Sequence, residues 1–197
     1  MPRIEFGLAF DFMTERAGLD RVLEEYESLL QPAEQLGFSS IWAGESYPTA
    51  PGSYHLPSPF LALASLARRT RLKIGTGVIL LPAWHPLRLA YDAAVLDQIA
   101  GGRLILGVGA GSPKLWARFG ADRASLAEWL DDMLGALRAL WTGAPGFSGS
   151  RIRVQDGILP RPSQPNGPPI WVGGRVPRAA RRAANFGDGW YASTQYR

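Results

Sequence analysis

Glycines follow two apolar strand-like segments of this sequence, an arrangement that suits a phosphate-bearing cofactor. Residues 104–108 (LILGV) run directly into Gly109, Ala110 and Gly111, and residues 170–172 (IWV) run into Gly173 and Gly174. Glycine lets backbone N–H groups approach an anion or a flat ring closely. Tight strand-to-helix turns also use glycine, so either loop alone is compatible with both interpretations.

Arginine supplies most of the positive charge, and it gathers after the second glycine loop. The formal net charge is +4, and lysine occurs only at Lys73 and Lys114. The cluster consists of Arg175, Arg178, Arg181 and Arg182. A solvated helix face, a nucleic-acid surface and a site for a polyanionic cofactor tail are the three interpretations. Because aromatic residues do not interleave with these arginines as in a single-strand platform, nucleic acid is disfavoured, and the neighbouring glycines favour the cofactor.

Side chains for acid–base or metal chemistry are few. Cysteine is absent, which excludes disulfides, thiolate catalysis and cysteine-ligated metals. The only histidines, His55 and His85, are isolated from carboxylate clusters, so no metal site is expected. Glu45, after an apolar segment, and His55, in a proline-rich loop, are the two candidate catalytic residues, and each also fits an exposed or solvated position.

Composition indicates a globular protein with a substantial core. The chain has 197 residues, of which 46% are apolar, and no apolar run approaches the ~20 residues of a membrane helix. The N-terminus lacks the apolar region of a secretory signal. We therefore expect one domain over residues 1–197, located in the cytoplasm, with no membrane partner.

Apolar spacing predicts alternating strands and helices, which is typical of a parallel sheet covered by helices. The expected strands are residues 6–10, 40–43, 72–81, 104–108, 170–172 and 189–192. The expected helices are residues 19–36, 60–69, 86–99, 126–141 and 177–185. Pro32 should kink or restart the first helix. Residues 142–169, dense in glycine and proline, are expected to form a long excursion beside the active face within the same domain.

Four ordered segments carry a family resemblance. They are residues 33–45 (AEQLGFSSIWAGE), residues 74–78 (IGTGV) with His85 and Pro86, residues 96–111 (LDQIAGGRLILGVGAG), and residues 168–190 (PPIWVGGR to NFGDGW). Together they resemble the luciferase-like flavin monooxygenase family, including its branch that uses the deazaflavin coenzyme F420.

The resemblance implies a (β/α)8 TIM barrel of the luciferase-like type. Only about six of its eight strands are present, so the C-terminal part of the barrel is expected to be missing. Two open edges would be an aggregation hazard. We therefore expect a segment of a longer product, or a partner that closes the gap, and favour the first.

The same resemblance implies the cofactor site. Gly77 and Val78 match a strand bulge, often with a non-prolyl cis peptide, that supports one face of the cofactor ring. An ordinary bulge is the alternative at these positions. The other cofactor-binding candidates are Glu45, Ala110, Gly111, Gly173, Gly174, Arg175, Val176 and Pro177. Gly173 and Gly174 would offer N–H donors to a phosphate, Pro177 would start a helix whose N-terminus favours an anion, and Arg175 would clamp the phosphate unless it points to water.

By resemblance the chain is an FMN- or F420-dependent oxidoreductase, with the two cofactors close to equally favoured. The first reading is a monooxygenase that acts on a small organic substrate with paired donors and molecular oxygen. The alternatives are an F420-dependent hydride-transfer dehydrogenase or reductase, and a non-catalytic flavin-binding relative. Ser46 and Ser112 stand where the sugar-phosphate dehydrogenases of the family have a histidine and a glutamate, which disfavours that chemistry because serine alone is no general base. A homodimer is the expected assembly.

Overall fold

A single parallel sheet forms the centre of the molecule. The computed structural model describes residues 4–10, 18–47 and 58–192. The sheet order is β1-β2-β3-β5-β8-β9, and the short strand β4 also pairs with β5. These strands are β1 (Gly7–Phe10), β2 (Ser40–Ala43), β3 (Lys73–Thr76), β4 (Ile79–Leu80), β5 (Leu104–Gly109), β8 (Ile170–Gly173) and β9 (Gly189–Tyr191). All of these pairs are parallel, which confirms the predicted α/β class.

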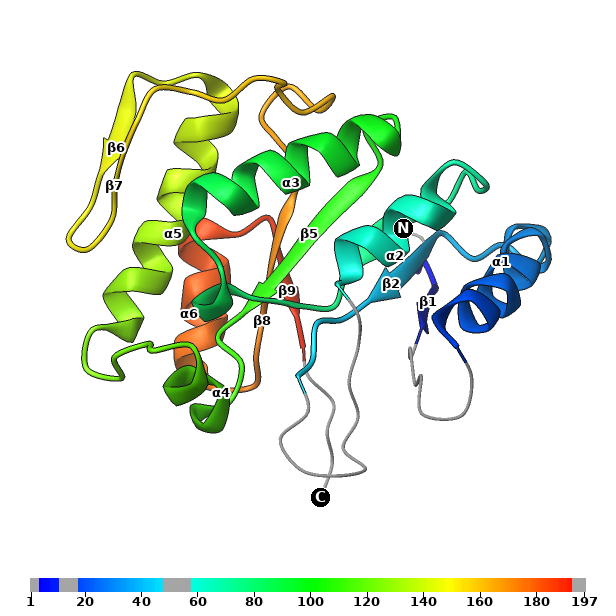
Figure 1. The fold of residues 1–197 in the computed structure, drawn as a ribbon, viewed down its shortest axis with the longest axis horizontal. Helices are drawn as coiled ribbons and strands as arrows, with labels where there is room; N and C mark the ends of the chain where they lie inside the picture. The colour runs from blue at the N-terminus through cyan, green and yellow to red at the C-terminus, as the bar shows by residue number, and fades with distance from the viewer. Residues whose placement is uncertain (1–3, 11–17, 48–57, 193–197) are drawn as a thin grey trace.

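Helices connect successive strands and pack against the outside of the curled sheet (Figure 1). They are α1 (Leu19–Gln35), α2 (Pro59–Ala67), α3 (Pro86–Ile99), α4 (Pro113–Arg118), α5 (Leu126–Thr142) and α6 (Pro177–Phe186), with a 3-10 turn η1 (Leu81–Ala83) after β4. The expected elements all form, and α4 is an additional one. No helix among the described residues is long and apolar enough to cross a membrane.

The strands β2 and β5 are buried along their whole length, as is usual for parallel sheets. On the helical side, Trp141 of α5 is fully buried and its Nε1–H donates to the carbonyl oxygen of Ala90 at 3.1 Å. This contact joins α5 to α3 over the sheet.

The third predicted strand, residues 72–81, is interrupted in the middle. β3 ends at Thr76, β4 begins at Ile79, and the peptide bond between Gly77 and Val78 is cis, as the family resemblance implies. The N–H of Gly77 still donates to the carbonyl oxygen of Ala43 at 2.9 Å. The interruption therefore remains attached to β2 and turns residue 78 toward the carboxyl ends of the strands.

Helix α1 does not restart at Pro32, contrary to expectation. Pro32 lies inside one continuous helix, three residues before its end. A proline there removes one hydrogen bond, while the buried Leu30 and Ala33 hold both sides of this position against the core.

The segment 142–169 lies away from the active face, which corrects the sequence prediction. It contains an antiparallel hairpin of β6 (Gly146–Ser148) and β7 (Arg153–Gln155) along the outside of α5. Its later part is fixed by Gln164, whose side-chain Nε2–H donates to the Asp97 carboxylate at 2.8 Å and to the carbonyl oxygen of Leu104 at 2.9 Å. Because Leu104 begins β5, this segment covers the amino ends of the strands.

Candidate functional site

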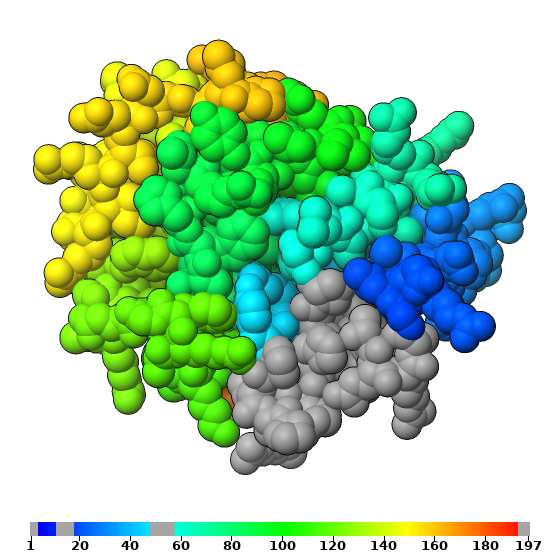
Figure 2. Space-filling view, viewed as in Figure 1, coloured from blue at the N-terminus to red at the C-terminus, as the bar shows by residue number. Residues whose placement is uncertain are grey.

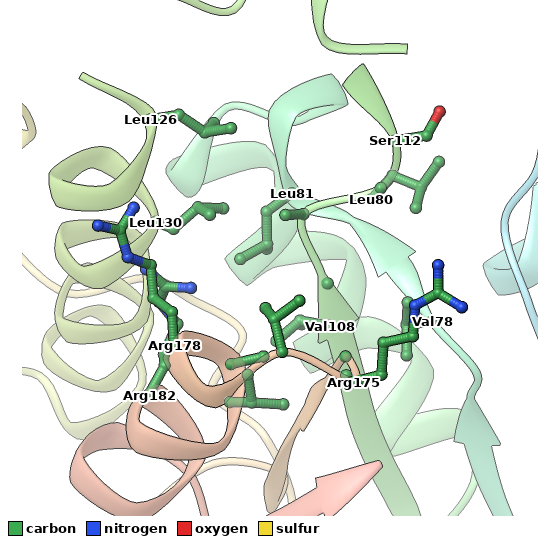
Figure 3. Close-up of a pocket in the computed structure, with 18 of the residues that line it drawn as sticks. Val78, Leu80, Leu81, Val108, Ser112, Leu126, Leu130, Arg175, Arg178 and Arg182 are labelled. Atoms are coloured by element: carbon green, nitrogen blue, oxygen red, sulfur yellow. The ribbon is translucent and has the colours of Figure 1, made fainter. Parts of the chain in front are cut away.

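A pocket of about 820 Å³ opens at the carboxyl ends of β4, β5 and β8. Its volume falls in the usual range for small-molecule sites, and this edge of a parallel sheet is where such sites gather. Much of the lining is aliphatic, from both the strand ends and α5 (Figure 3). The aliphatic residues of the lining are Val78, Leu80, Leu81, Val108, Leu126, Leu130 and Val172.

Val78 occupies space that two glycines leave open. A Cβ on Gly109 would lie 2.8 Å from Cγ2 of Val78, and a Cβ on Gly173 would lie 2.9 Å from its Cγ1. Neither glycine has a positive φ. Glycine is therefore required at the ends of β5 and β8, because any side chain there would displace Val78.

The other end of the pocket is the N-terminus of α6. The N-cap residue, Val176, provides no side-chain hydrogen bond, and no described carbonyl accepts from the N–H of Val176 or Arg178. Unpaired N–H groups at the start of a helix bind anions. The sequence predicted that the N–H of Gly174 donates to a phosphate. In the structure this N–H donates to the carbonyl oxygen of Tyr191 at 3.2 Å and is not free for a ligand.

Four arginines line the pocket: Arg123, Arg175, Arg178 and Arg182. In Figure 3, Arg178 and Arg182 lie together beside Leu130, and Arg175 lies on the opposite side of the pocket. Arg182 is buried and pairs with Asp131 of α5. The other three form no ion pair with a carboxylate of the described residues. Their uncompensated charge favours a negatively charged ligand group.

Most of the residues predicted to bind a cofactor meet in this pocket. Those that line it are Gly77, Val78, Ala110, Gly111, Gly173, Gly174, Arg175 and Val176. Pro177 begins α6 next to it and is not a lining residue. His55 falls outside the described residues. His85 caps α3 through its imidazole, which accepts from the N–H of Leu87 at 3.3 Å.

Glu45 is buried behind the pocket wall and does not line it. Its carboxylate accepts from the N–H of Leu80 at 2.7 Å and from Nε1–H of Trp84 at 3.0 Å. The hydroxyl of Tyr47 donates to the same carboxylate at 2.5 Å. Burial, followed by this hydrogen bond to Glu45, raises the pKa of Tyr47, so the phenol stays protonated as a donor.

Sequence reasoning missed several lining residues from remote segments. Leu126 and Leu130 lie in the predicted helix 126–141, and in the structure they are buried and also line the pocket. Arg123 and Tyr191 carried no distinctive sequence signal. Trp116 also lines the pocket, whereas Trp42 and Trp171 pack on one another with ring centroids 5.2 Å apart.

The lining is suited to binding a reactive group more than to supplying one. Among its described residues there is no aspartate, glutamate, histidine or lysine, and no metal-binding cluster occurs in the described part of the chain. One end is aliphatic and accepts a flat apolar ring, and the other combines a helix N-terminus with unpaired arginines. A planar ring system that carries a phosphate fits both ends.

Comparison with known proteins gives consistent matches over nearly the whole chain. The sequence model described as luciferase-like monooxygenase matches residues 6–196. The oxygenase component of a flavin-dependent trigonelline monooxygenase from Acinetobacter baylyi is 34% identical over 182 residues, which cover 90% of this chain and 49% of that protein. An F420-dependent hydroxymycolic acid dehydrogenase from Mycobacterium tuberculosis is 32% identical, over 84% of this chain and 48% of the relative.

A solved structure supports the same grouping. Monooxygenase RslO1 from Streptomyces bottropensis aligns with a TM-score of 0.80 and 32% identity, covering 92% of this chain and 57% of that one. The chain thus spans about half the length of the curated relatives that it matches.

Proposed function

Because this chain belongs to the luciferase-like monooxygenase family, we propose that its pocket binds FMN or coenzyme F420 as part of an oxidoreductase. The observation that carries the proposal is the two-ended pocket, aliphatic at the strand ends and cationic at the start of α6. We propose one barrel-type domain over residues 1–197, supported by the single sheet that joins β1 to β9.

The residues of this chain would position the cofactor. Val78 would support one face of the ring, with Ala110 and Gly111 beside it. Arg175, Arg178 and the N–H of Val176 would hold the phosphate. When bound, FMN would supply oxygen-dependent chemistry and F420 would supply hydride transfer. The aliphatic side chains of Leu80, Leu126 and Leu130 would exclude water from the ring, which strengthens polar interactions inside the site.

The first proposal is a monooxygenase acting on a small organic substrate with molecular oxygen. The absence of aspartate, glutamate, histidine and lysine from the described lining supports it, because the cofactor then carries the reactive centre. An F420-dependent dehydrogenase or reductase is the second proposal, supported by the three arginines without a carboxylate partner, which suit a more anionic cofactor. A non-catalytic flavin-binding relative would bind a cofactor tightly without turning over.

Fluorescence titration with FMN, riboflavin and F420 tests the site. We expect FMN or F420 to bind at micromolar concentration. We expect riboflavin to bind at least about tenfold more weakly than FMN, because charge-assisted hydrogen bonds to the phosphate contribute about 1.5–3 kcal/mol. Arg178→Ala should narrow the difference between FMN and riboflavin. Arg68→Ala, at the exposed end of α2, should leave the difference unchanged. Failure of the folded protein to bind FMN and F420 would reject the proposed function.

A homodimer is also proposed, with α3 as the contact. Leu87, Tyr91, Val95 and Ile99 follow one another at four-residue spacing and are all exposed. They form an apolar stripe on α3, which lies beside α2 on the face shown in Figure 2. Sedimentation over a range of protein concentrations should show a dimer that Tyr91→Glu dissociates, and a monomer at every concentration would reject the pairing.

We also propose a cytoplasmic location, which cell fractionation would test.

A further inference from the structure

Glu45 connects the end of β2 to the pocket wall through both its side chain and its main chain. Three donors from different parts of the chain point at the carboxylate: the N–H of Leu80, Nε1–H of Trp84 and the hydroxyl of Tyr47. The N–H of Glu45 in turn donates to the carbonyl oxygen of Val78 at 3.1 Å. Glu45 therefore holds both ends of the segment 78–80.

That segment forms the part of the pocket that would face the ring. The side chain of Val78 stands against Gly109 and Gly173. The side chain of Leu80 lies close to Gly111, where a Cβ would be 3.3 Å from Cδ2 of Leu80. A small displacement of the segment would therefore bring Val78 or Leu80 into the backbone of the neighbouring strand ends, and the ring support would lose its shape.

Only a carboxylate satisfies all three donors. An ionised glutamate offers two acceptor oxygens, whereas a glutamine amide offers one and presents an NH₂ group to a donor. The side chain of Glu45 is also 8% exposed, so a donor left unpaired there would be shielded from water. Since its oxygens are occupied by protein donors, Glu45 is not placed to exchange a proton with a ligand in the pocket.

We propose that Glu45 is a positioning residue, which fixes the 78–80 segment so that Val78 and Leu80 support the cofactor ring, and not a residue that contacts the cofactor or transfers a proton. The proposal rests on the proposed function for its effect on cofactor binding. Its effect on the segment itself exists without cofactor.

Glu34 provides a matched control for this test. Its carboxylate also joins distant segments, accepting from the hydroxyl of Thr70 at 2.5 Å and the N–H of Arg71 at 2.7 Å. Glu34 lies at the end of α1 and does not line the pocket. Glu34→Gln should therefore lower stability without changing the 78–80 segment.

Hydrogen exchange of the cofactor-free protein is the first measurement, followed by FMN affinity and the visible circular dichroism of the bound flavin. Glu45→Gln should raise exchange across residues 78–84, weaken FMN binding by at least tenfold and alter the flavin signal. Glu34→Gln should leave all three readouts as in the wild type. Tyr47→Phe and Trp84→Phe each remove one donor to Glu45 and should give smaller changes of the same kind. These two variants replace Glu45→Gln as the test if Glu45→Gln does not fold.

The outcomes separate the two proposals. Wild-type exchange at residues 78–84 in Glu45→Gln, or equal changes in Glu34→Gln, would overturn the positioning role. Raised exchange specific to Glu45→Gln, in a wild-type protein that binds neither FMN nor F420, would support the positioning of the segment and reject the cofactor site.

Discussion

At the scale of single residues, the pocket depends on which side chains are absent. Gly109 and Gly173 admit the side chain of Val78 between two strand ends. The sequence suggested that glycines in these loops bring backbone N–H groups to an anion. In the structure, the N–H of Gly174 donates to the carbonyl oxygen of Tyr191, and the donors that we propose for an anion lie at the start of α6. The glycines shape the ring end, and α6 shapes the charged end.

Gly173→Ala is expected to weaken FMN binding. The added methyl would lie 2.9 Å from Cγ1 of Val78 and 3.2 Å from the carbonyl oxygen of Val108, so Val78 must move. Overpacking of this kind costs about 1–3 kcal/mol, or about fivefold to a hundredfold in affinity if the cost falls on the bound state. Gly135→Ala crowds the ring of Phe147 outside the pocket and is the control. An unchanged dissociation constant for FMN in Gly173→Ala would contradict the role given to Val78.

At the scale of elements, hydrogen-bonded side chains fix the helices that frame the sheet. Arg182 of α6 pairs with Asp131 of α5 and also donates to the carbonyl oxygen of Ala127 at 3.2 Å. This attachment holds α6 with Arg178, one turn earlier, at the pocket. Glu34 similarly ties the end of α1 to the segment before β3.

Stability at acid pH should depend on Glu34. Hydrogen bonds from the Thr70 hydroxyl and the Arg71 N–H lower the pKa of this carboxyl below its ordinary value of 4.5. A carboxyl with a lowered pKa in the folded state stabilises the protein above the unfolded pKa, and this contribution is lost as the pH falls through the folded pKa. The free energy of unfolding, measured with urea from pH 7 to pH 3, should therefore fall more steeply for the wild type than for Glu34→Gln.

At pH 7, Glu34→Gln should cost about 1 kcal/mol, less than the ~1.5–3 kcal/mol typical of charged hydrogen bonds, because the group is partly exposed to solvent. If the free energies of unfolding of the wild type and Glu34→Gln change in parallel with pH, the ionisation of Glu34 does not contribute to stability.

At the scale of the whole molecule, the site is assembled from segments remote in sequence. Val78, Ala110 and Arg175 follow three different strands, β3, β5 and β8. The parallel sheet makes this possible, because all its strands present their carboxyl ends at one edge. The segment 142–169 closes the opposite edge, where Gln164 binds Asp97. The pocket thus lies at the carboxyl ends of the strands, and the segment 142–169 packs against their amino ends.

A bound cofactor should stabilise the whole sheet, because its binding site draws on so many segments. At a hundredfold excess over the dissociation constant, linkage gives about 2.7 kcal/mol. For a domain of this size, that energy raises the melting temperature by about 5–10 °C. Differential scanning fluorimetry with FMN and F420 measures the shift. Riboflavin at the same concentration should give a smaller shift, and equal shifts would argue against the phosphate end of the site.

Local sequence determined which elements form and in what order. The apolar run 104–108 and the helical spacing of α5 and α6 act over a few residues, so they could be identified before any tertiary contact was known. The family resemblance marked the Gly77–Val78 interruption and the lining residues at the ends of β5 and β8. It could not distinguish a residue that lines the pocket from one that supports the wall.

Tertiary structure alone decided which side chains meet. Glu45 and Leu80 are 35 residues apart, and their contact requires β2 to pair with β3, so that β4, which follows β3 in the chain, lies within reach of the end of β2. The placement of residues 142–169 at the far edge depends on Gln164 reaching Asp97, 67 residues away. Such contacts depend on the three-dimensional arrangement of the strands and not on local periodicity. For that reason the sequence predicted a glycine-lined cofactor site followed by an arginine cluster, whereas the burial of Glu45 behind the pocket wall and the place of Arg123 in the lining emerged only from the fold.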